Sequence, residues 1–66
     1  MQSAAHIAPE FQDLFALHVR CSVRRDELLA RGRRLAAEGK KREAQHALKV
    51  ATKLQTALDA MERALS

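Results

Sequence analysis

Residues 44–65 read AQHALKVATKLQTALDAMERAL, and apolar residues recur in this segment at alternating steps of three and four. The series consists of Ala44, Ala47, Ala51, Leu54, Leu58, Met61 and Leu65. An α-helix has about 3.6 residues per turn, so these positions form one narrow apolar seam along a single helix face. Such a seam is typical of a helix that packs against another helix along its length. We therefore predict a helix over about 41–64.

A matching seam lies upstream and consists of Phe11, Leu14, His18, Cys21, Arg25, Leu28, Gly32 and Leu35. Pro9 suits the first turn of a helix, where its missing N–H is not needed. Gly39 suits the left-handed position that ends a helix. These features predict a first helix over about 9–37, a turn near 38–40, and an all-α antiparallel two-helix hairpin.

Two parts of the first half carry weaker signals. Gly32 costs a helix about 1 kcal/mol relative to alanine, so a break of the first helix near Gly32 is the alternative to one continuous helix. Residues 1–8 show no hydrophobic periodicity and are predicted to be a flexible leader.

The size of the chain limits how stable a lone hairpin can be. Chains of this length, 66 residues, seldom gain more than about 3–5 kcal/mol from one apolar core without a disulfide, a metal or a partner. Cys21 is the only cysteine, which excludes an intramolecular disulfide. We therefore expect the hairpin to be completed by a second copy, as a four-helix bundle, or by a helical partner protein.

The same features bear on the compartment. No apolar run approaches the roughly 20 residues that cross a bilayer. The N-terminus lacks the basic region and apolar core of a signal peptide, and one free thiol suits a reducing environment. A cytoplasmic location without membrane contact is the expectation.

A second apolar row remains outside the predicted seams. Phe15, Val19 and Val23 are spaced by four and point away from the seam of the first helix, and Leu48 departs from the seam of the second. Exposed apolar rows indicate an interface, so these four residues are the predicted partner interface. Incidental exposure is the competing interpretation, because single apolar residues are common on protein surfaces.

Charge gathers at the turn, where Arg31, Arg33, Arg34, Lys40, Lys41 and Arg42 form a predicted basic patch. The chain has 12 Lys and Arg against 8 Asp and Glu, a net charge of +4. This excess permits an acidic partner, and it leaves open a homodimeric basic hairpin that binds nucleic acid as a small regulator. Tyr and Trp are absent, which disfavours base stacking. A solvated turn that complements the C-terminus of the first helix explains part of the cluster without any ligand.

Residue types that support catalysis do not occur in workable patterns. His6, His18 and His46 have no zinc-ligand spacing, the serines have no base at recognisable spacing, and no glycine-rich phosphate loop is present. The sequence therefore predicts no enzyme activity, no metal and no cofactor.

The length, the hairpin layout and the stretch from Leu35 to Leu65 resemble the small co-chaperones of type III secretion needle subunits. The matching features are the turn Ala37-Glu38-Gly39 and the segment ATKLQTAL at 51–58, and they cover about half of the chain. The resemblance implies a helical hairpin that binds a tetratricopeptide-type chaperone. In that family the pair caps the needle subunit and prevents its premature polymerisation in the cytosol.

Overall fold

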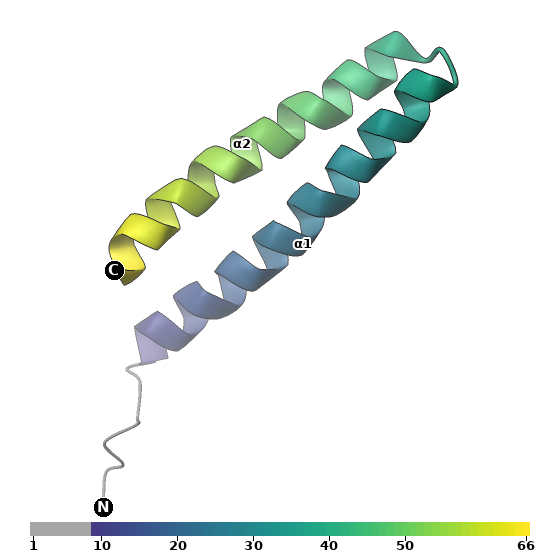
Figure 1. Cartoon of the computed structure of the whole chain (residues 1–66). Helices are drawn as coiled ribbons and strands as arrows, with labels where there is room; N and C mark the ends of the chain where they lie inside the picture. Colours follow the sequence, from purple (N-terminus) through teal and green to yellow (C-terminus); the bar gives the residue numbers. More distant parts are fainter. Residues whose placement is uncertain (1–8) are drawn as a thin grey trace, which may run out of the picture.

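The chain folds as two long α-helices joined by a tight turn. The computed structural model describes residues 9–66, with side chains from Gln12 onward. Helix α1 spans Pro9–Ala37 and α2 spans Lys41–Leu65, and the two run side by side in opposite directions (Figure 1). The predicted all-α antiparallel hairpin is therefore confirmed. The predicted leader, 1–8, lies outside the described residues.

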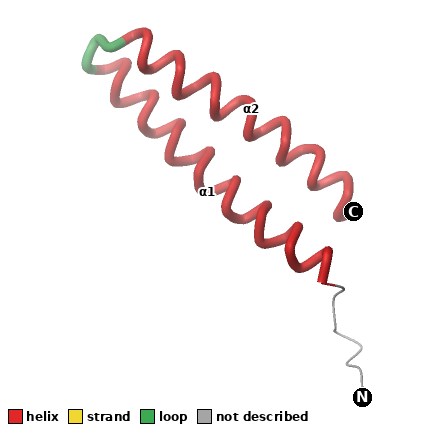
Figure 2. Tube along the Cα trace, turned by 180° about the vertical axis from the view of Figure 1, so that it is seen from behind, coloured by secondary structure: helices red, strands yellow, loops and turns green. Residues whose placement is uncertain are grey.

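The turn between the helices is set by Gly39 (the green segment in Figure 2). Gly39 has a φ of 81°, a left-handed conformation that glycine adopts without strain. The N–H of Lys40 donates to the carbonyl of Leu35 at 2.9 Å, and the N–H of Gly39 donates to that of Ala36 at 3.0 Å. This pair of bonds is the Schellman motif, which satisfies the last carbonyls of α1 and reverses the chain.

The core is a thin strip between the two helices. Its buried side chains are Leu28, Leu35, Ala44, Ala47, Ala51 and Leu58, and every one of them belongs to a predicted seam. Alanines supply the α2 side in the half nearest the turn, where small side chains let two helix backbones approach closely. Nearer the open end, Leu14, Met61 and Leu65 are only half-buried. The side chain of Phe11 lies outside the described residues.

Three contacts across the interface define the register of the helices. Leu48 packs against Gly32, Arg25 Nη1 donates to Gln55 Oε1 at 2.7 Å, and His18 Nε2 lies 3.2 Å from Glu62 Oε2. From one contact to the next, the position moves by seven residues on each helix. This heptad step is the repeat of an antiparallel coiled coil.

The register leaves the start of α1 without a facing helix. Continuing the heptad step beyond the His18–Glu62 contact passes the last residue of α2 before it reaches the first turn of α1. Figures 1 and 2 both show this end of α1 projecting past the end of α2.

Gly32 lies within α1, which is continuous through this position, so a break there does not occur. A Cβ atom at residue 32 would lie 2.8 Å from Leu48 Cδ2 and 2.9 Å from Leu48 Cγ. Real Cβ atoms do not approach carbon atoms this closely. Gly32 therefore forms a notch in α1 that receives the Leu48 side chain, and its lack of a side chain favours close helix packing.

Candidate functional site

Three apolar side chains project from the outer face of α1. Phe15 is 61% exposed, Val19 45% and Val23 52%. They are spaced by four over about 12 Å of helix, so they form one continuous strip. We call these three residues the apolar row. The structure thus brings together three of the four residues that the sequence predicts as a partner interface.

Leu48, the fourth predicted interface residue, lies elsewhere. It sits on α2 against Gly32, and it is 39% exposed. Gly32 is nine residues beyond Val23 along α1, or about 13 Å closer to the turn. Because part of its surface already covers Gly32, Leu48 contributes to the packing of the hairpin itself. It is separated from the apolar row along the helix axis.

All six residues of the predicted basic patch are exposed at the turn end of the hairpin: Arg31, Arg33, Arg34, Lys40, Lys41 and Arg42. Lys40 Nζ lies 3.5 Å from Glu38 Oε1, an exposed ion pair of small energetic value. The patch is divided between faces. Arg31 and Arg42 border a groove between the helices, whereas Arg33 and Arg34 do not.

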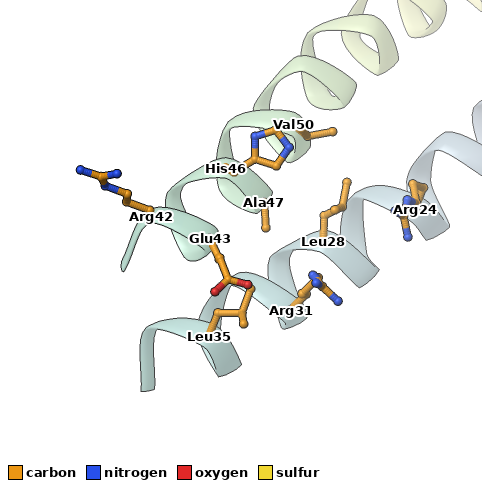
Figure 3. A pocket seen from close by; sticks show the side chains of 9 residues that line it. All are labelled: Arg24, Leu28, Arg31, Leu35, Arg42, Glu43, His46, Ala47 and Val50. Atoms are coloured by element: carbon orange, nitrogen blue, oxygen red, sulfur yellow. The ribbon is translucent and has the colours of Figure 1, made fainter. Parts of the chain in front are cut away.

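The groove is a feature that the sequence analysis missed. It has a volume of about 750 Å³ and lies on one side of the hairpin near the turn. Its lining, drawn in Figure 3, consists of Arg24, Leu28, Arg31 and Leu35 from α1 and of Arg42, Glu43, His46, Ala47 and Val50 from α2. We call it the basic groove. On α1 the lining residues recur at steps of four, three and four, a spacing that would have identified them as one stripe.

Positive charge surrounds an apolar floor in the basic groove. Leu28, Leu35 and Ala47 are buried and form the floor. The three arginines and His46 are exposed and border this floor. In Figure 3 the Arg42 side chain extends outward from α2, away from the protein. A smaller hollow of about 240 Å³, which Arg42, Gln45, His46 and Lys49 line, continues the basic surface over the outer side of α2.

The opposite flank of the interface has a different chemistry. Gln55 Nε2 donates to Asp59 Oδ1 at 2.9 Å, and Gln55 Oε1 accepts from Arg25 Nη1. Arg25 also contacts Asp26 at 3.0 Å. Glu62 contacts His18 on the same flank. Carboxylates therefore gather beside this edge of the seam, and cations gather beside the other. The two long sides of the hairpin differ in charge.

No metal-binding group is found among the described side chains, those of residues 12–66. Within that range, no group of three His, Cys, Asp or Glu side chains is placed to hold a metal ion. Cys21 is a free thiol, half-buried in the seam. Over the same residues, neither helix has both the length and the apolar character needed to cross a membrane.

No protein-family model, no curated protein and no solved structure matches this chain.

Proposed function

We propose that this protein is a non-enzymatic, cytoplasmic protein-interaction module whose apolar row binds a helical partner. One observation carries the proposal: Phe15, Val19 and Val23 are about half exposed or more, and they lie on the face of α1 turned away from α2. A contiguous apolar strip on a small protein with a thin core indicates a surface that a partner covers.

The spacing of the apolar row matches helix-mediated recognition. Apolar residues at i, i+4 and i+8 insert together into a groove or against another helix. Phe15 supplies the aromatic anchor that interface hot spots favour, and the valines flank it. The partner covers α1 from outside, which adds apolar burial that the hairpin alone lacks.

As the specific role we propose a co-chaperone of a type III secretion needle subunit, with a tetratricopeptide-type chaperone as partner. This role rests on the resemblance of the turn and of residues 51–58 to that family. The helical hairpin fits it, because the concave surfaces of helical repeat proteins accept amphipathic helices.

The test is co-purification with the needle-subunit chaperone of the source organism, expressed together with this chain. Replacing Phe15, Val19 and Val23 with glutamine should weaken the complex by about 10²–10⁴ in affinity. The matched control places glutamine at Thr52, Lys53 and Thr56, three exposed positions on the outer side of α2. Circular dichroism should show the same helical melt for both triple variants. A complex that survives the apolar-row changes contradicts the proposed surface.

The second candidate function is binding of nucleic acid by a homodimer of the hairpin. The observation that favours it is the crowding of six exposed cations at the turn end. Each phosphate contact releases counterions, so binding of this kind weakens steeply as salt rises. Binding through the apolar row changes little with salt, so a salt titration of duplex DNA binding separates the two functions.

A further inference from the structure

We propose that the basic groove is a second docking surface, and that it binds an acidic amphipathic helix of a partner protein. This surface is independent of the apolar row, which lies on another side of α1. Its position between two packed helices makes it the place where a third helix completes a bundle.

The dimensions of the groove suit a helix. From Arg24 to Leu35 the groove follows twelve residues of α1, or about 17 Å from the first to the last, which corresponds to roughly three helical turns of a bound segment. Both walls are continuous helix, so the groove is formed before a partner arrives. Laying an amphipathic helix into such a groove is a recurring mode of peptide recognition.

The basic groove offers an apolar surface on which the apolar stripe of a bound helix can pack. Leu28, Leu35 and Ala47 form the groove floor, and Val50, which is half-buried, also lines the groove. On α1 the same stripe continues toward the open end through Cys21 and Leu17, at the alternating steps of three and four that keep residues on one helix face. Leu17 is 40% exposed, so apolar surface extends beyond the basic part of the groove.

The charge of the groove selects an acidic occupant. Three arginines line it, and Glu43 is the one carboxylate in its lining. Arg24 pairs with Glu27 at 3.3 Å, whereas no ion pair within the described part of the chain engages Arg31 or Arg42. Arg31 from α1 and Arg42 from α2 are exposed where they border the groove, and Arg42 extends outward from α2, so both guanidinium groups can reach a carboxylate on a bound helix.

Other occupants match this surface less well. Residues 1–8 contain no Asp or Glu, so this segment lacks the charge that the groove selects. A second copy of the chain has a net charge of +4, which repels the positive charge of the groove. A partner helix with leucines on one face and glutamates beside them matches both the floor and the rim.

The test measures binding of fluorescent synthetic peptides to the full chain. The first peptide has about 18 residues, a length that allows a helix to form on binding. It carries leucines at helical spacing, with glutamates on both sides of the leucine stripe. A second peptide has glutamine in place of every glutamate, and a third has alanine in place of every leucine. We expect saturable binding of the first peptide, with affinity at least about tenfold lower for each of the others.

Two double variants of equal charge locate the site. Arg31→Glu with Arg42→Glu changes the groove, and Arg33→Glu with Arg34→Glu changes exposed arginines that do not line it. The groove variant should lose at least about tenfold in affinity for the acidic peptide, and the control should stay within about threefold. Should the glutamates lower the helical melt, Arg31→Gln with Arg42→Gln gives the same comparison at smaller charge change.

Five results would overturn the proposal. The first three concern the peptides: no saturable binding of the acidic peptide, equal binding of the glutamine peptide, or equal binding of the leucine-free peptide. The other two are equal loss of affinity in the groove variant and the control, and tighter groove-dependent binding of a DNA duplex. Dimerisation of the chain that Arg31→Glu with Arg42→Glu abolishes, without peptide binding, would assign the groove to a second copy instead. Glutamines in the apolar row should leave peptide binding unchanged, so failure here is distinguishable from failure of the proposed function.

Discussion

Replacing Gly32 with alanine tests whether the notch in α1 determines how closely the helices pack. Alanine is better than glycine inside a helix by about 1 kcal/mol, so helix propensity alone predicts a gain in stability. In the structure, the contact with Leu48 opposes this gain and is expected to cancel or exceed it. A Cβ at residue 32 would meet Leu48 Cδ2 at 2.8 Å, so the leucine side chain must move away.

The cost follows from the burial of Leu48. Fully burying a leucine side chain contributes about 1.5–3 kcal/mol, and Leu48 is 39% exposed, so leaving its site forfeits about 1–2 kcal/mol. Subtracting the gain in propensity leaves Gly32→Ala neutral or destabilising by up to about 1 kcal/mol. In a chain that already carries Leu48→Ala, both close contacts are removed, and the same substitution should stabilise by about 1 kcal/mol.

A double-mutant cycle with urea unfolding, followed by circular dichroism, measures both values. The expected coupling between the two positions is about 1–2 kcal/mol. Ala30→Gly, an exposed position in the same helix, calibrates the propensity difference in this chain. If Gly32→Ala stabilises the chain equally with and without Leu48, the close contact does not exist and the argument for the notch fails.

The remaining predictions address the core, the turn and the basic patch. Leu58→Ala should lower the free energy of unfolding by about 2–4 kcal/mol, because Leu58 is 1% exposed, and Leu17→Ala, at 40% exposure, should lower it by less than half as much. Equal melting temperatures of the two variants would contradict the predicted seam. Gly39→Ala should cost about 1–2 kcal/mol through its φ of 81° alone, since no atom lies within 4 Å of a Cβ there, and an unchanged urea midpoint would refute that cost. Replacing the exposed cations Arg33, Arg34, Lys40 and Lys41 with glutamine should leave helicity and the melting temperature near those of the native chain, because each contributes only tenths of a kcal/mol. Unfolding of this variant would show that the turn is packed.

Local patterns in the sequence determined both helices, the two seams and the turn. The seam positions depend only on spacing within one helix, and the turn depends on one glycine that tolerates a positive φ. These features act over a few residues, so they are visible without knowledge of the rest of the chain. The seam even placed the polar residues Arg25 and His18 at the interface, where the structure pairs them with Gln55 and Glu62.

Tertiary structure alone decided which residues of α1 lie opposite which residues of α2. Spacing within each helix allows several registers, and only the packing of the two helices selects the one in which Leu48 enters the notch at Gly32. The same register places Arg31 and Arg42 on the lining of one groove, whereas the sequence had grouped them only as members of the basic patch at the turn. Sequence periodicity predicts only the face of its own helix on which a residue lies. The groove forms only where side chains from both helices lie next to each other, and this placement depends on contacts between residues far apart along the chain.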